Sequence, residues 1–326
     1  MRRTVKLATT AGAFVAAGAV ATVLNDRHRT SRRRRRGEDV EFGSVRSTPL
    51  SVLAPDGVAL HVEVDEADRA TPTIVFLHGW VEDSDVWHYQ RLALRGRVRT
   101  VFVDLRSHGR SGRSYAGNSS LADLADDLET VLDQVVPQGP VVLVGHSMGG
   151  MTIMELARTR PDLFGDRVQG VVLVSTSSGK LMRSSPALRY LVPLLRAGTP
   201  MLNWGRRFNS YSIIKRWGLG PNAQERHADM ANEMILRAPT RVLMDFYPNF
   251  VSLDLTAGLR DLGRARTTVI GGTADLLTPI KHARVLADRI PDAKLVVLED
   301  VGHMVPFEAH ETVTKAIEDV LEDIES

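Results

Sequence analysis

The chain has 326 residues, 43% of them hydrophobic and 25% charged, and it contains no cysteine. This composition is typical of a folded globular protein and excludes a disordered or fibrous one. The lack of cysteine excludes disulfides, a thiol nucleophile and a cysteine-ligated zinc site. The net charge of +2 hides an asymmetry, because the first 36 residues hold ten basic residues and one acid, while the rest holds 31 basic and 38 acidic residues. The body of the protein therefore offers no broad basic face for nucleic acid.

The first segment of the chain has the pattern of a membrane signal. Residues 7–24 form an uncharged apolar run at the lower length limit for a membrane-spanning helix. Because more positive charges follow this run than precede it, including the arginines at 32–36, we expect an uncleaved anchor, with the folded domain on the cytoplasmic side and the arginines near anionic lipid. The alternatives are export after signal cleavage, near Ala19-Val20-Ala21, and a solvated basic tail. On either interpretation residues 1–40 precede the folded domain.

From residue 45 onward, short apolar runs alternate with amphipathic helical patterns. Runs such as Val141–Val144 and Val171–Val174 are continuously apolar, as in strands buried on both faces of a parallel sheet. Helical patterns such as Leu121–Val135 and Pro279–Ile290 separate them. We therefore predict an α/β fold, a doubly wound and mostly parallel eight-stranded sheet. The predicted strands are Leu50–Leu53, Ala59–Val64, Thr73–Leu77, Thr100–Asp104, Val141–Val144, Gly170–Ser175, Thr267–Ile270 and Lys294–Leu298.

The alternation stops between residues 179 and 262. This stretch shows no convincing strand, and its prolines and glycines predict several short helices. It holds eight of the 18 aromatic residues and five of the ten methionines. Because long insertions in compact domains are usually functional, we predict an apolar helical cap inserted between two core segments, 41–178 and 263–326. The alternative is a small helical core that packs on itself.

A candidate nucleophile lies between a predicted strand and a predicted helix. The segment Gly145-His146-Ser147-Met148-Gly149 has the pattern G-x-S-x-G, and it follows the strand that ends at Val144. A nucleophilic serine on a sharp strand-to-helix turn requires this context, with glycines at its sides because the turn leaves no room for side chains. The helix N-terminus behind the turn places N–H groups near developing negative charge. Ser147 is therefore the predicted nucleophile.

With this motif, residues 45–325 resemble the α/β-hydrolase family, of the serine esterase and lipase type with a helical cap. The segment His78-Gly79-Trp80, after a predicted strand, is similar to the family's H-G turn. That resemblance implies an oxyanion hole made by the backbone N–H groups of Trp80 and Met148. The segment Asp104–Ser111 resembles the family's D-x-x-G-x-G-x-S loop, with Ser107 in place of the first glycine, and by this resemblance it is architectural.

A serine hydroxyl also needs a base to take its proton and an acid to hold that base in the right tautomer. The family order is serine, acid, histidine. Asp275 follows the strand predicted at 267–270, and His303 follows the strand predicted at 294–298. Both lie at the carboxyl edge, where open α/β sheets build their sites. We therefore predict the catalytic triad Ser147, Asp275 and His303.

The resemblance implies an enzyme that hydrolyses a carboxylic ester through an acyl-enzyme on Ser147, with no cofactor and no metal. Dehalogenases and epoxide hydrolases of this fold carry aspartate at the same turn, so Ser147 argues against both. The apolar cap and the membrane segment favour a lipid-like or long-chain ester. Two alternatives remain open. One is a C–C bond hydrolase or cofactor-free perhydrolase of the same fold, and the other is a non-catalytic ligand-binding protein.

Overall fold

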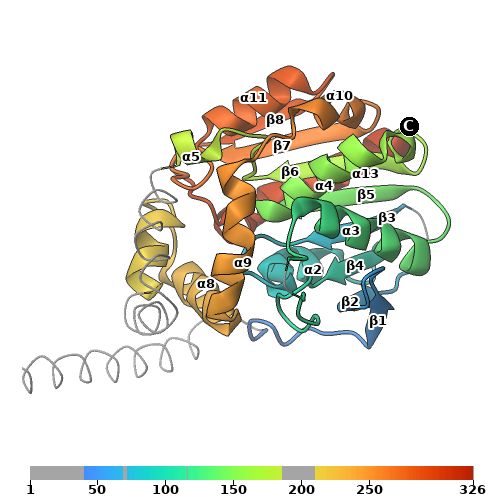
Figure 1. The fold of residues 1–326 in the computed structure, drawn as a ribbon. Coiled ribbons are helices and arrows are strands. Elements are labelled where there is room, and N and C mark those ends of the chain that lie inside the picture. Colours follow the sequence, from blue (N-terminus) through green and yellow to red (C-terminus); the bar gives the residue numbers. More distant parts are fainter. Residues whose placement is uncertain (1–39, 69–71, 116, 186–209, 326) are drawn as a thin grey trace, which may run out of the picture.

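An eight-stranded sheet forms the centre of the molecule (Figure 1). The structure is a computed structural model that describes residues 40–68, 72–115, 117–185 and 210–325. Across the sheet the strands have the order β1-β2-β4-β3-β5-β6-β7-β8. β1, β2 and β4 pair antiparallel, and all other neighbours pair parallel, which confirms the predicted fold. The strands are β1 (Pro49–Leu53), β2 (Ala59–Asp65), β3 (Thr73–Leu77), β4 (Thr100–Val103), β5 (Val141–His146), β6 (Val168–Val174), β7 (Arg266–Gly272) and β8 (Lys294–Leu298).

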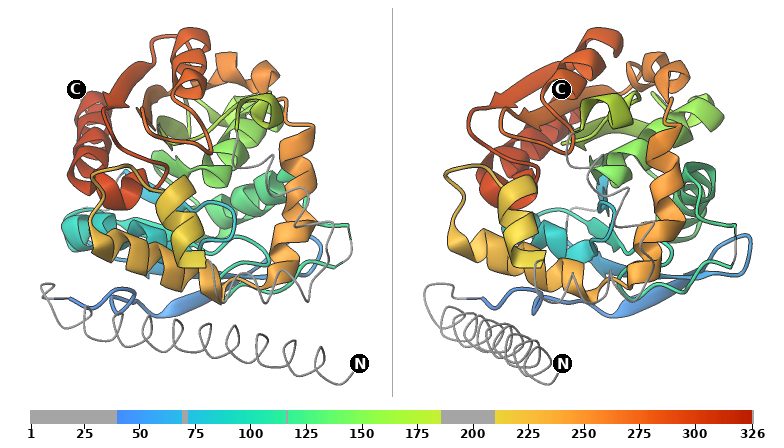
Figure 2. Two further views of the ribbon diagram at one scale, coloured as in Figure 1. Left: turned by 90° about the vertical axis from the view of Figure 1, so that its left-hand side faces the viewer. Right: turned by 60° about the vertical axis from the view of Figure 1, so that its left-hand side comes forward.

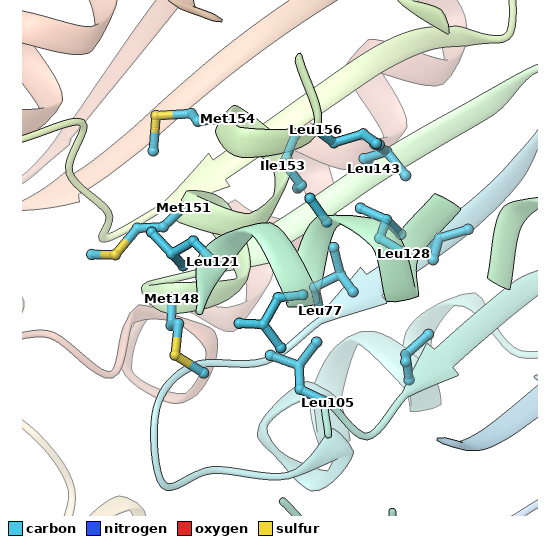
Figure 3. Packing of buried hydrophobic residues seen from close by; sticks show 14 of the residues in the cluster. Leu77, Leu105, Leu121, Leu128, Leu143, Met148, Met151, Ile153, Met154 and Leu156 are labelled. Atoms are coloured by element: carbon cyan, nitrogen blue, oxygen red, sulfur yellow. The ribbon is translucent and has the colours of Figure 1, made fainter. Parts of the chain in front are cut away.

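Helices cover both faces of this sheet, as the unbroken apolar strands predict. Successive side chains of a strand point to opposite faces, so Val141 and Leu143 of β5 enter one hydrophobic cluster while Val142 and Val144 enter the other. The first cluster lies against α3 (Leu121–Val135), α4 (Met148–Thr159), η2 (Pro161–Leu163) and α11 (Lys281–Arg289), and Figure 3 shows its packing around α4. The second lies against η1 (Ser84–Trp87), α2 (His88–Leu94), α12 (Val305–Glu308) and α13 (His310–Glu325).

Where the structure describes it, the stretch predicted as a cap consists of helices joined by short turns, with one isolated bridge between Gly179 and Asp254. It contains α5 (Leu181–Ser184), a helix over residues 210–217, α8 (Glu225–Arg237), α9 (Thr240–Val251), η3 (Thr256–Gly258) and α10 (Leu259–Leu262). Figures 1 and 2 show α8 and α9 together on one side of the molecule. The indole of Trp80, after β3, donates to the carbonyl of Val242 on α9 (3.1 Å), so α9 lies over the carboxyl edge of the sheet.

The segment predicted as a membrane anchor, residues 7–24 with the arginines at 32–36, lies outside the described residues. Within the described residues, none of the helices combines the length and the apolar character needed to cross a bilayer.

Candidate active site

Ser147 lies at the junction of β5 and α4 in a strained conformation. Its backbone has φ +50° and ψ −112°, in a region that side-chain-bearing residues rarely adopt. Three hydrogen bonds hold the turn. Ser147 N–H donates to Val174 O (2.9 Å), and Ser147 O accepts from Thr176 Oγ1 (2.7 Å) and from Met151 N–H (3.2 Å). The neighbouring strand β6 and the first turn of α4 therefore fix the serine at the carboxyl edge of the sheet.

The glycines beside Ser147 are required by close backbone contacts. A Cβ atom on Gly149 would lie 2.2 Å from the carbonyl oxygen of Leu77, at the end of β3. A Cβ atom on Gly145 would lie 2.6 Å from the backbone of Gly149. Only glycine permits these approaches, so the turn packs directly on the end of the neighbouring strand.

Asp275 and His303 meet at the same edge, on the loops that follow β7 and β8. His303 Nδ1 lies 2.9 Å from Asp275 Oδ2, and both side chains are buried. Asp275 Oδ1 accepts from the N–H groups of Leu277 and Thr278 (2.8 Å each), and Oδ2 accepts from Thr278 Oγ1 (2.7 Å). Because this carboxylate only accepts, the hydrogen of a neutral His303 ring resides on Nδ1, and Nε2 is left able to take a proton.

The surroundings of this pair favour its charged forms. Burial would lower the pKa of His303, but the carboxylate of Asp275, with smaller contributions from Glu82 and Glu308, raises that pKa above its usual value. Burial would likewise raise the pKa of Asp275, but His303 and the hydrogen bonds from Thr278 hold that pKa below its usual range. The pair is therefore suited to stabilise an imidazolium when His303 accepts a proton.

The serine turn and the histidine loop are joined through the residue before the serine. His146 Nε2 lies 2.9 Å from the backbone oxygen of His303, and the centres of the two imidazole rings are 4.9 Å apart. The structure thus brings the turn of Ser147 together with the Asp275–His303 pair.

The two predicted oxyanion donors also lie beside the serine. Met148 is the first residue of α4 and directly follows Ser147. Trp80 follows Gly79, where an added Cβ would come within 3.1 Å of Ser147 Cβ. The loop after β3 therefore touches the serine turn. The Trp80 ring packs edge-on against Phe250 of α9, with 5.0 Å between ring centres.

The 104–111 loop has the architectural contacts that the resemblance implies. Asp104 accepts hydrogen bonds from the N–H groups of Ser84 (2.8 Å) and Arg110 (2.9 Å). Ser107, which replaces the glycine of the family pattern, adopts φ +67°, in the left-handed region that favours glycine. Its Oγ accepts from Ser114 N–H (2.9 Å), which compensates part of that strain.

Sequence reasoning missed three side chains that support these loops. Thr278 donates to Asp275, and its position three residues after the acid could have indicated this. Glu82 accepts from Gly79 N–H (2.6 Å), and Glu308 Oε2 accepts from the N–H groups of Gly220 (2.7 Å) and Gly302 (3.2 Å). No sequence pattern marks these two glutamates, because these partners are backbone groups that only the fold brings near them. In the described part of the chain, no group of three or more histidines and carboxylates is arranged to hold a metal ion.

Comparisons with known proteins agree with this architecture. A family model described as "Alpha/beta hydrolase family" matches residues 74–316. The chain belongs to the alpha/beta hydrolase family. It is therefore an enzyme of the α/β-hydrolase fold, as the sequence predicts.

Among its relatives, a pimeloyl-acyl-carrier-protein methyl ester esterase of Nitrosomonas europaea is 29% identical over 247 residues, which cover 72% of this chain and 90% of the relative. An sn-1-specific diacylglycerol lipase of Mus musculus is 36% identical over 144 residues, covering 44% of this chain and 41% of that protein. Among solved structures, the esterase RhEst1 from Rhodococcus sp. ECU1013 superposes with a TM-score of 0.72 at 23% identity, covering 85% of this chain and 99% of that one. This last likeness concerns the fold alone.

Proposed function

We propose that this enzyme hydrolyses a carboxylic ester through an acyl-enzyme on Ser147. The observation that carries the proposal is the 2.9 Å contact between Asp275 and His303 on the edge where Ser147 occupies its strained turn. The family, and relatives whose names describe ester hydrolases, support the same chemistry.

In the proposed reaction, Ser147 Oγ attacks the ester carbonyl carbon while His303 Nε2 takes the hydroxyl proton. The N–H groups of Trp80 and Met148 stabilise the negative charge on the carbonyl oxygen. His303 then gives its proton to the leaving alkoxide, which departs as an alcohol. A water molecule repeats the sequence on the acyl-enzyme and releases the acid, and Asp275 stabilises the imidazolium in both halves.

We infer an apolar acyl group in the substrate. Supporting this, the aromatic rings of Trp80 and Phe250 lie in edge-on contact near the proposed oxyanion loop. Phe246 and Phe250 of α9 are buried among the apolar side chains of the same region. Apolar rings near the scissile bond favour a hydrocarbon chain over a charged one.

The test is hydrolysis of nitrophenyl esters, from short to long acyl chains, by the full-length chain and by Ser147→Ala. We expect Ser147→Ala to lose at least a thousandfold in kcat, because removal of a nucleophile leaves only the remaining stabilisation of the transition state. An optimum at longer acyl chains would support the apolar substrate.

Ser177→Ala is a matched control for this experiment. Ser177 Oγ also contacts a histidine, with 2.8 Å to His282 Nδ1, but this serine is fully buried and lies outside the strained turn. We expect it to keep its activity. If Ser147→Ala retained full esterase activity, the proposal would be wrong. A folded wild type that is inactive on esters but labelled at Ser147 by a fluorophosphonate would favour C–C hydrolysis or perhydrolysis, and absence of labelling would favour ligand binding.

We also propose that residues 7–24 attach the enzyme to a membrane, with the arginines at 32–36 on the cytoplasmic side. The length of the apolar run and the distribution of charge support this. Fractionation of cells should place the full-length chain with the membranes until detergent is added. A shortened chain recovered outside the membranes would instead favour a cleaved export signal.

A further inference from the structure

A buried acid and a buried histidine lie under the site, and the proposed reaction does not use them. Glu82, on the loop after β3, is 4% exposed, and His146, the last residue of β5, is fully buried. His146 Nδ1 lies 2.9 Å from Glu82 Oε2. The same carboxylate oxygen accepts a 2.6 Å hydrogen bond from Gly79 N–H.

The partners of His146 define its protons. On one side its Nδ1 faces a carboxylate, and on the other its Nε2 faces the backbone carbonyl of His303 at 2.9 Å. A neutral imidazole has one N–H and one bare nitrogen, so it can donate to only one of two such acceptors. With an N–H on each nitrogen the ring donates to both. A bare nitrogen facing an acceptor would instead remain buried without a hydrogen bond, which costs about 1–3 kcal/mol.

The carboxylate supplies the opposite charge. Burial alone would raise the pKa of Glu82, but the adjacent His146 and its hydrogen bond hold that pKa below its usual value. A buried charge is tolerated when it is paired and hydrogen-bonded, and here each partner meets both conditions.

We propose that Glu82 and His146 form a buried carboxylate–imidazolium pair that positions the oxyanion loop and the histidine loop against the Ser147 turn. One end of the pair holds Gly79, the residue before the donor Trp80. The other end holds the backbone of His303, the base. His146 itself directly precedes Ser147 in the chain, so the pair is joined to the Ser147 turn by a peptide bond. Two contacts of 2.9 Å thus link three segments that are far apart in sequence, and the 2.6 Å bond from Gly79 to Glu82 fixes the first of them internally.

This inference rests on the proposed function for its catalytic meaning, since Glu82 and His146 act through other residues and do not touch the substrate. They are positioning residues. Because misplacement of reacting groups by about 1 Å can cost roughly a hundredfold in rate, loss of the pair should lower kcat.

The first test reads the protonation of His146 and needs no substrate. In the full-length chain labelled with ¹⁵N-histidine, we expect the His146 ring to show two protonated nitrogens in the buffer and at the pH of the ester assay, because each ring nitrogen faces an acceptor. The signals are assigned by their loss in His146→Gln, or through the His146 backbone if that variant does not fold. A bare ring nitrogen on His146 at that pH would overturn the proposal.

His227 is the internal control for this spectrum. It is 2% exposed, and within the described chain neither of its ring nitrogens has a hydrogen-bond partner. Burial lowers the pKa of His227 to about 4, so its ring should show one bare nitrogen under the same conditions.

The second test uses substitutions that remove the charge but keep the shape. In Glu82→Gln the amide can offer its oxygen to Gly79 N–H or its NH₂ to a neutral His146, but it cannot balance an imidazolium. We expect kcat to fall about 10- to 100-fold with KM changed less than about threefold, and the His146 ring to lose one N–H.

Two variants of His146 separate its two bonds. His146→Asn places an amide near the former Nδ1 and can keep the contact to Glu82, whereas His146→Gln places one near the former Nε2 and can keep the contact to His303. Each should lower kcat, and Glu82→Gln combined with His146→Gln should lower it less than the product of the two single losses, because both variants break one linked unit. Full additivity, or unchanged kcat in Glu82→Gln, would contradict the positioning role.

Failure of this inference and failure of the proposed function give different results. If the enzyme does not hydrolyse esters, the nitrogen spectrum still reports whether the pair exists. If esters are hydrolysed through Ser147 and the ring of His146 is neutral, the pair is wrong while the proposed function stands.

Discussion

The role proposed for His303 requires that its Nε2 carries no proton at the start of each turnover. The base works only when Nε2 is bare, and the carboxylate of Asp275 raises the pKa at which the ring loses its proton. The Asp275–His303 pair also stabilises the fold, within a range of pH that has an upper and a lower limit. This contribution is lost as pH rises through the raised pKa of His303, and it is also lost as pH falls through the lowered pKa of Asp275.

We therefore predict that kcat/KM rises with pH through an apparent pKa above 6.5, the usual value for histidine. Below that pKa the imidazolium cannot accept the serine proton, so activity falls. The measurement is kcat/KM for a short nitrophenyl ester across the acid and neutral range.

Asp275→Asn provides the comparison for this profile. It removes the charge that raises the pKa of His303, so its residual activity should be low and its rising limb should move to lower pH. A wild-type limb that lies below 6.5, or one that does not move in Asp275→Asn, would show that another group controls the profile.

Residues 218–220, which we call the strap, are hydrogen-bonded to the loop that carries His303. The carbonyl of Gly218 accepts from the N–H groups of His303 (2.9 Å) and Met304 (3.1 Å). Glu308 adds a second attachment, because its Oε2 accepts from Gly220 N–H and Gly302 N–H. His303, the proposed base, is thus held by residues 218–220 as well as by β8, and displacement of this strap would displace His303.

We predict that Gly220→Ala displaces His303, the proposed base, without altering any proposed catalytic side chain. The added Cβ would lie 2.1 Å from the carbonyl oxygen of Asp300 and 2.9 Å from the nitrogen of Gly302, so the strap and the loop must separate. Since these are backbone atoms with little room to move, kcat/KM should fall about 10- to 100-fold and the melting temperature should decrease.

Gly218→Ala is the matched control, two residues away in the same strap. Its Cβ would lie 3.1 Å from the carbonyl oxygen of Ile214, a contact that a small shift relieves. We expect a much smaller loss of activity. Equal kinetics and stability for Gly220→Ala and the wild type would refute the coupling between the strap and His303.

The sequence predicted the sheet more completely than it predicted the site. Every predicted strand is present within a few residues, because apolar β-branched runs bounded by turns mark strands in the sequence. The central strands β3 and β5 are buried along their whole length, as their unbroken apolar runs predict. Ser147, Asp275 and His303 could be predicted as a triad because each follows a strand within a motif, and the structure places all three at one edge of the sheet. Glu82, Glu308 and Gly218 were not predicted. Their backbone partners leave no spacing in the sequence, and the side-chain partner of Glu82, His146, is 64 residues away and is brought near it only by the fold.

Side chains from the described part of the predicted cap belong to the same hydrophobic clusters as side chains of the core. Val242, Phe246 and Phe250 of α9 belong to the cluster that lies under α3 and α4, and Met230 and Met234 of α8 belong to the cluster on the other face of the sheet. Side chains that complete a common core lose their packing when either part unfolds. The cap segments 210–262 and the sheet should therefore unfold together.

We predict that Phe246→Ala destabilises the whole molecule. Phe246 is fully buried, and its ring lies 4.9 Å from that of His108 on the architectural loop, so truncation leaves a cavity between cap and core. The expected loss in the free energy of unfolding is about 3–5 kcal/mol, measured by denaturant titration of the full-length chain. Because the cavity lies between the two parts, we expect a single transition with its midpoint lowered and its slope unchanged.

Val251→Ala, on the last turn of the same helix, is the control. Its side chain is 58% exposed, so its truncation should change the free energy of unfolding by less than about 0.5 kcal/mol. Two separate transitions in the wild type, or a Phe246→Ala variant in which only the earlier one moves, would mean that the cap is an independent unit. Its attachments at Gly218 and Trp80 would then act as hinges, and the cap could open without loss of the sheet.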